Sequence, residues 1–186
     1  MFEQITSIEP LEEVKKNLSN QIDTLHPKAT SRSLSHLNTA MYEWNLGKRW
    51  ENKDRAYVFT KDYKGFIFFE RTIRQPLHTT LFHLFTIEEH RDKGIGRDLF
   101  NFMREMTLEQ FPDMRFRMFV NKPAIGFYEK LGFTQYHGIS KSGLPFFYGD
   151  FFGNLLPLPP KQMKYVKVFH EEHDSIHNNN SLTPFI

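Results

Sequence analysis

The stretch "HRDKGIGRDLFNFM", residues 90–103, constrains the fold more than any other part of the sequence. It follows the apolar segment "TTLFHLFTI", residues 79–87, and from Ile95 its own apolar positions recur at helical spacing. A strand that turns through Gly94 and Gly96 into a helix is therefore predicted. Because the strand is apolar on both faces, we expect it to be central in its sheet.

The charges at the start of this helix are unusual. Arg91, Lys93 and Arg97 stand where the helix dipole is already positive, although helices ordinarily place Asp or Glu there. Gly94 and Gly96 carry no side chain to keep a ligand from the backbone, and the amides of a first helical turn point at an anion. The pattern predicts a phosphate-binding turn, with solvated cations beside a tight turn as the alternative.

Two other phosphate-binding loops fit this turn less well. A P-loop has four residues between its glycines and then Lys-Ser or Lys-Thr, whereas only Ile95 separates Gly94 from Gly96. A dinucleotide-binding loop has a third glycine where Leu99 stands. We set both aside.

The rest of the chain predicts further helices and strands around this turn. Helical periodicity in the first fifty residues indicates two amphipathic helices within residues 8–46. A helix is expected from Ile95 to before Pro112, and a second one within "NKPAIGFYEKLGF", residues 121–133. Strands are expected at residues 55–60, 65–73, 79–87, 114–120, 133–139 and 144–152.

Length and composition limit the class of protein. The 186 residues, 39% of them hydrophobic, suit one domain over residues 1–153, followed by an extension over 154–186 with a poorly ordered end. A formal charge of +2 disfavours nucleic acid as a partner, and no apolar stretch is long enough to span a membrane. The start lacks the pattern of a secretory signal, so we expect a soluble, cytoplasmic protein. The absence of cysteine excludes thiol nucleophiles, thiolate metal sites and disulfides.

Two motifs, in order and suitably separated, resemble those of the GNAT superfamily of acetyl-CoA-dependent acyltransferases. The R-x-x-G-x-G loop of that family matches Arg91, Gly94 and Gly96. Its N-x-x-A-x-x-x-Y-x-x-x-G-F pattern matches Asn121, Ala124, Tyr128, Gly132 and Phe133. The resemblance covers residues 55–152; it is weak in the first fifty residues and absent from the extension.

The resemblance implies an α/β (α+β) fold, with a central mixed, mostly antiparallel sheet splayed between two strands and flanked by helices. It implies acetyl-CoA as co-substrate, with the acetyl group in the gap beside the strand that begins near Arg115. The pantetheine arm would bind the backbone before the loop, and the pyrophosphate would bind the amides of the loop. The residues so implied to bind the cofactor are Leu84, Phe85, Thr86, Arg91, Asp92, Lys93, Gly94, Ile95, Gly96, Arg97, Asn121 and Tyr128.

The family mechanism, carried over, is direct transfer to an amine. The amine attacks the thioester, a strand amide near Phe85 stabilises the oxyanion, and Tyr128 protonates the departing thiolate. The alternative interpretations are a core aromatic on an apolar helix stripe for Tyr128 and a helix cap for Asn121.

The sequence assigns no general base. Many relatives place a glutamate on the strand before the asparagine, but the equivalent residue here is Phe116. By strict alternation His83 projects from the face opposite Thr80 and Leu84, and it has the pattern of a core histidine. Glu70, Glu88 and Glu89 remain candidates.

The sequence therefore predicts an N-acetyltransferase that modifies a primary amine of a small molecule or a protein. The alternative is a GNAT-like CoA-binding or regulatory module without turnover, and a longer acyl donor is a narrower variant. Candidates for acceptor binding are Tyr42, Trp44, Trp50 and the Ser140 hairpin, and a homodimer is left open. His170, His173 and His177 share a helical face but lack the H-E-x-x-H spacing, so no metal site is predicted.

Overall fold

The computed structural model describes residues 2–5, 20, 24, 53–60, 62–73, 76–163 and 166–167. The chain divides into two compact units, Met1–Met118 and Phe119–Ile186. Of the two helices expected within residues 8–46, the structure describes only Asn20 and Thr24; both are helical, and the Thr24 hydroxyl donates to the Asn20 carbonyl at 2.7 Å. The second of those helices and the histidine-rich tail lie outside the described residues.

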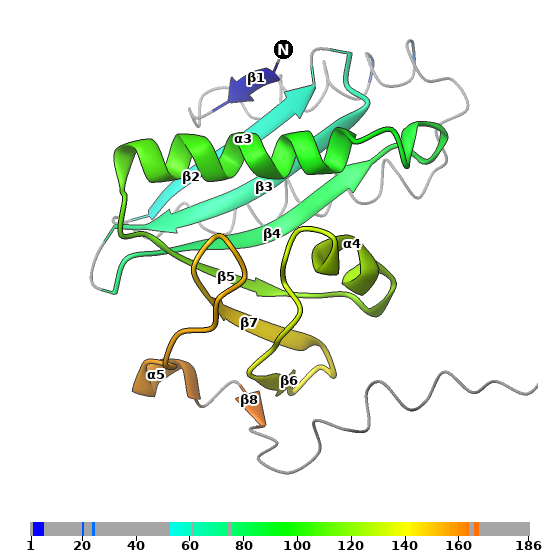
Figure 1. The fold of residues 1–186 in the computed structure, drawn as a ribbon. Helices are drawn as coiled ribbons and strands as arrows, with labels where there is room; N and C mark the ends of the chain where they lie inside the picture. The colour runs from blue at the N-terminus through cyan, green and yellow to red at the C-terminus, as the bar shows by residue number, and fades with distance from the viewer. Residues whose placement is uncertain are drawn as a thin grey trace, which may run out of the picture. The chain divides into compact units, whose positions relative to one another are not determined.

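The first unit is built on a mixed, mostly antiparallel sheet, as predicted (Figure 1). Its strands lie in chain order, each antiparallel to the next until β4 pairs with β5 in parallel. They are β1 (Phe2–Ile5), β2 (Lys53–Thr60), β3 (Gly65–Thr72), β4 (His78–Thr86) and β5 (Arg115–Phe119), the last residue of β5 belonging to the second unit. The β4 strand is internal, as its apolar composition indicated.

Strand β1 was not predicted from the sequence, and it lies before the two helices expected within residues 8–46. Phe2 pairs with Thr60 and Ile5 with Tyr57, so these four residues extend the sheet beyond β2. Four residues are too few to display an alternating pattern, and their strand conformation depends on ladder hydrogen bonds to a segment more than fifty residues away.

The β4 strand contains a β-bulge. Leu81 pairs with Phe69 and His83 with Phe68, so Phe82 is the extra residue. The parallel register between β4 and β5 runs from His78 opposite Arg115 to Leu81 opposite Met118, and no pairing of β4 with β5 is found beyond it in the described residues. The bulge therefore coincides with the point where the two strands separate, which is the predicted splay.

Helix α3 (Ile95–Gln110) covers one face of this sheet across β2, β3 and β4 (Figure 1). It buries Leu99, Phe100 and Met103, and it stops two residues before Pro112, as expected. The Phe100 ring meets Phe116 of β5 edge-on, with 5.5 Å between centroids. Its first turn lies so close to β3 that a Cβ atom on Gly65 would be 2.9 Å from the Ile95 Cγ2 atom.

The second unit contains the second motif and a small antiparallel sheet. After the 3-10 turn η3 (Lys122–Ala124) and the helix α4 (Ile125–Glu129), strand β6 pairs on one side with β7 and on the other with β8. These strands span Gly138–Ser140, Pro145–Gly149 and Val166–Lys167, and the short helix α5 spans Pro160–Met163. Residues 141–143 form the predicted hairpin turn, in which the Gly143 amide donates to the Ser140 carbonyl at 2.9 Å.

The segment after residue 153 contributes to this second unit. Leu156 and Leu158 pack against a buried cluster of Phe146, Tyr148 and Val166. The strand expected at residues 133–139 is shorter than its apolar pattern suggested and begins only at Gly138. Within the described ranges, no helix is long and apolar enough to cross a membrane.

Candidate active site

The loop between β4 and α3 has the geometry that its glycines predicted. Gly94 is the N-cap of α3 with φ of +84°, and no side chain caps the helix start. Asp92 also has a positive φ, +61°, which is uncommon for a residue with a Cβ atom. The first helical hydrogen bond runs from the Asp98 amide to the Gly94 carbonyl, so the turn opens amides of the first helical residues toward the loop.

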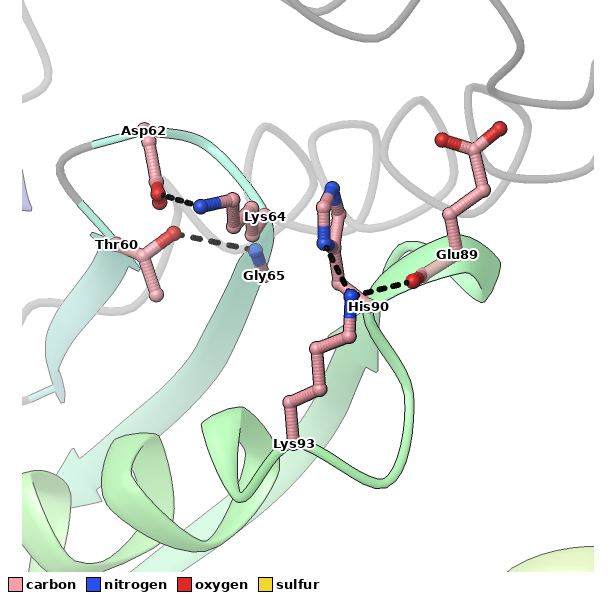
Figure 2. Close-up of polar contacts among 7 residues, drawn as sticks. All are labelled: Thr60, Asp62, Lys64, Gly65, Glu89, His90 and Lys93. Carbon is pink, nitrogen blue, oxygen red and sulfur yellow. Dashed lines mark hydrogen bonds and ion pairs between the residues drawn. The ribbon is translucent and has the colours of Figure 1, made fainter.

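Two exposed cations of the loop, Lys93 and Arg91, contact residues of the preceding turn. Lys93 donates through Nζ to the Glu89 carbonyl at 3.1 Å and lies 3.5 Å from His90 Nδ1 (Figure 2). The guanidinium of Arg91 is 3.6 Å from a carboxylate oxygen of Glu88, and both side chains are more than half exposed. Exposed ion pairs of this kind contribute little to stability, so these cations are available to a stronger anion.

The turn between β2 and β3 is hydrogen-bonded to the end of β4 that precedes the loop. Lys64 pairs with Asp62, and the Gly65 amide donates to the Thr60 hydroxyl at 3.3 Å (Figure 2). The Ile87 amide, just after β4, donates to the Lys64 carbonyl at 2.9 Å. This bond fixes the end of β4 directly before the loop.

Leu84, Phe85 and Thr86 form the part of β4 beyond the bulge. They pair with Ile67, Phe66 and Gly65 of β3 on one side, and the register with β5 has already ended on the other. All three are half-buried. A strand edge of this kind offers alternating N–H and C=O groups to an extended ligand.

Asn121 and Tyr128 lie in the second unit. Asn121 directly precedes η3, and Tyr128 lies in α4. Asn121 is exposed and is the N-cap residue of η3, with extended backbone angles, but its side chain makes no capping hydrogen bond. Tyr128 is 8% exposed, and its ring meets Phe127 and Phe133 edge-on at 5.1 and 6.3 Å. Its carbonyl accepts from the Phe133 amide at 3.0 Å, in the turn that follows the end of α4 at Glu129.

Burial keeps the hydroxyl of Tyr128 protonated. Desolvation, with a smaller contribution from Tyr136, raises the pKa of Tyr128 far above its ordinary value. Tyr136 was not singled out in the sequence, where it lay within a predicted strand and belonged to neither motif. Burial, followed by the negative charge of Glu129, raises the pKa of Tyr136 to about 12, and its buried hydroxyl has no hydrogen-bond partner in the described residues.

The candidate bases differ sharply in accessibility. Phe116 is fully buried under α3, so its position cannot serve the opposite face of the sheet. Glu70 is 1% exposed, whereas Glu88 and Glu89 are exposed in the 3-10 turn η2 (Glu88–His90). His83 is half-buried, and the bulge turns it to the same face as Thr80, so the alternation argument against it was wrong on that point.

The remaining candidates are the residues expected to bind the acceptor and any group that could bind a metal. Ser140 is buried, and its hydroxyl lies 2.9 Å from that of Ser142, which makes it part of the hairpin turn. Tyr42, Trp44 and Trp50 lie outside the described residues. No group of three His, Cys, Asp or Glu side chains that could hold a metal ion occurs in the part of the chain that the structure describes.

Comparison with protein families agrees with the loop and the second motif. A family model described as the acetyltransferase (GNAT) domain matches residues 52–135, from just before β2 to just after α4. Residues 52–135 are a GNAT acetyltransferase domain. The GNAT domain contains both motifs. No curated protein matches the chain.

Solved structures resemble the chain in fold. A protein of the GNAT family from Desulfovibrio desulfuricans is 10% identical, with a TM-score of 0.51, and the match covers 81% of this chain and 98% of that one. PaiA N-acetyltransferase from Thermoplasma acidophilum, in complex with coenzyme A, is 19% identical with a TM-score of 0.47, covering 81% and 99%. An aminoglycoside 6'-N-acetyltransferase complexed with coenzyme A is 14% identical with a TM-score of 0.49, covering 86% and 99%. The first of these likenesses shows the GNAT fold.

Proposed function

We propose that this protein is an N-acetyltransferase that transfers the acetyl group of acetyl-CoA directly to a primary amine of a small molecule or a protein. The observation that carries the proposal is the junction of β4 and α3 within the GNAT domain. There, the last residues of β4, which have no β5 partner in the described register, lead into α3. This helix starts at Gly94 without a side-chain cap, and exposed cations lie beside its start. This order of features suits a ligand with an extended arm and a diphosphate.

The cofactor is proposed to lie along this junction. Backbone groups of Leu84, Phe85 and Thr86 would bind the pantetheine arm, and the amides from Asp92 to Arg97 would bind the pyrophosphate. Lys93, now bonded to the Glu89 carbonyl, and Arg91 would turn their charges to the phosphates. Asn121 would hold the cofactor arm through its side-chain amide, which no helix cap engages.

The chemistry requires a proton for the thiolate that leaves. Tyr128 would supply it, because its hydroxyl is protonated throughout the neutral range. An amide of β4 near Phe85 would stabilise the oxyanion that forms on the thioester carbonyl.

The test is incubation with acetyl-CoA and a panel of small amines, peptide lysines and peptide N-termini. We expect free thiol to appear together with an acetylated amine of the correct mass, and the ratio of the two should approach one. Thiol without acetylated product is background hydrolysis and would not support the proposal. A folded protein that binds acetyl-CoA and modifies no amine would contradict it.

A CoA-binding module without turnover is the second candidate. It is favoured by the apolar residue Phe116, which is buried under α3 where many GNAT enzymes place a catalytic glutamate. For such a module, calorimetry would show acetyl-CoA binding while the amine panel yields no product.

A further inference from the structure

We propose that His83 is the general base that deprotonates the acceptor amine, an inference that rests on the proposed acetyl transfer. Amines of the lysine type have a pKa of about 10.4, so near neutral pH they arrive as ammonium ions that cannot attack a carbonyl carbon. Free histidine side chains lose their proton at about pH 6.5, which suits them to accept one from such an ion.

The β-bulge brings His83 to the required face. Residues directly opposite in a ladder point to the same side, so His83 shares a face with its partner Phe68. Thr80, opposite Glu70, lies on that face too, and so does Phe85, opposite Phe66. Without the extra residue Phe82, His83 would point toward α3, which covers the other face.

The imidazole is held beside the proposed oxyanion amide. Its ring stacks on the buried Phe68 ring, with 6.2 Å between centroids and 12° between planes, and Phe82 stacks on the same ring at 5.1 Å. Phe85 is two positions after His83 along the strand, a rise of roughly 7 Å. A side chain at that spacing reaches an amine at the thioester carbon directly or through one water.

The other ionisable groups on this face are less suited to the task. Glu70 is 1% exposed, and His78 is 8% exposed and bonded through its ring to the Pro76 carbonyl at 2.9 Å. Arg117 donates through Nε to the Thr80 hydroxyl at 3.1 Å, and it cannot accept a proton; the same holds for Arg115, which is exposed. The side chains of β2 lie outside the described part.

An imidazole nitrogen of His83 takes one proton from the ammonium ion. The lone pair of the resulting amine then forms the C–N bond to the thioester carbon. The C–S bond breaks with its electron pair on sulfur, and the thiolate takes a proton from Tyr128. The nitrogen of the new amide loses its surplus proton, which restores Tyr128, and His83 releases the first proton to solvent. The products are the acetylated amine, free CoA and one proton.

The experiment compares His83→Gln and His83→Ala with the unmodified protein, using an amine accepted in the panel, between pH 6 and 10. We expect both variants to bind acetyl-CoA with unchanged affinity and to lose roughly a hundredfold in kcat at pH 7. The loss should shrink toward pH 10, because the amine then arrives deprotonated. Added imidazole should restore part of the activity of His83→Ala.

The control is His137→Gln in the second unit, where the ring of His137 is bonded to the Tyr148 carbonyl at 2.9 Å. It should leave the pH profile of kcat unchanged. Unmodified protein that acetylates amines while His83→Gln keeps full activity, or loses it equally at every pH without imidazole rescue of His83→Ala, would overturn the assignment and leave the proposed function standing. If the unmodified protein acetylates no amine, both proposals fail together.

Discussion

Tyr128 is the residue whose proposed role depends most on its surroundings. Replacing it by phenylalanine keeps the buried ring and removes the proton, so acetyl-CoA affinity should hardly change while turnover falls by roughly ten- to a thousandfold at neutral pH. A thiol has a pKa of about 8.5, so at higher pH the thiolate can leave unprotonated and the defect should shrink. Steady-state rates across pH, with calorimetry for affinity, check this.

Tyr136→Phe is the matched control for that substitution. It also removes a buried tyrosine hydroxyl, and that of Tyr136 has no hydrogen-bond partner in the described residues. Its rate should follow the pH profile of the unmodified protein. Full activity of Tyr128→Phe at pH 7 would defeat the proton-donor role, and a uniform loss of cofactor affinity would make Tyr128 a binding residue instead.

Gly94 decides whether the loop can hold a diphosphate. Gly94→Asp places a carboxylate beside the start of α3, where the proposed pyrophosphate binds, so we expect acetyl-CoA binding to be lost in calorimetry; Gly96→Asp should act in the same way. The substitution also strains the backbone, because φ at Gly94 is +84°.

Gly143→Asp separates charge from strain. Gly143 has φ of +78°, lies in the hairpin turn of the second unit and, like Gly94, has no atom within 4 Å of a built Cβ position. It should lose similar stability and keep its acetyl-CoA affinity. Retained affinity in a folded Gly94→Asp variant would remove the loop from the cofactor site.

At the scale of elements, the contact between β3 and α3 positions the loop. A Cβ atom on Gly65 would be 2.9 Å from both the Ile95 Cγ2 atom and the Phe85 carbonyl oxygen. Gly65→Ala should therefore lower the free energy of unfolding by about 1–3 kcal/mol and weaken acetyl-CoA binding, because the first turn of α3 must shift. Denaturant unfolding and calorimetry measure the two effects.

Gly126→Ala is the comparison for Gly65→Ala. Gly126 lies in α4 with no atom within 4 Å of a built Cβ position, so alanine there should hold or raise stability by up to about 1 kcal/mol. Equal stability of the Gly65 and Gly126 variants would show that α3 does not depend on the missing side chain.

At the scale of the whole molecule, the end of the chain should be dispensable for cofactor binding. Deleting everything after His173 removes the asparagine run, which is too polar to join a core, and leaves β8 complete at Lys167. We expect unchanged acetyl-CoA affinity by calorimetry. Lost binding by a folded truncated protein would place the tail in the site.

A longer deletion should behave differently. Ending the chain after Asn154 also removes Leu156, Leu158 and Val166, which pack with Phe146 and Tyr148. We expect a measurable fall in the unfolding midpoint, because this deletion exposes apolar surface in the second unit. A midpoint equal to that of the full chain would contradict a structural role for this segment.

Local patterns in the sequence determined the elements and the ligand class. Gly94 and Gly96 indicated the start of α3, Pro112 its end, and the cations a phosphate, because helix caps and dipoles act within a single turn. The apolar run of residues 79–87 predicted β4 as an internal strand, and the two motifs indicated the family that residues 52–135 were found to match.

Only the tertiary structure decided what depends on pairing between distant segments. The bulge at Phe82 reverses the alternation that had set His83 on the wrong face, and nothing in the sequence of β4 marks it, since a bulge is defined against the partner strand. Strands β1 and β8 are likewise too short to carry a period of their own. The residue type of Asn121 allowed a cap or a ligand contact, and only the structure of η3 shows an N-cap residue whose side chain makes no capping hydrogen bond.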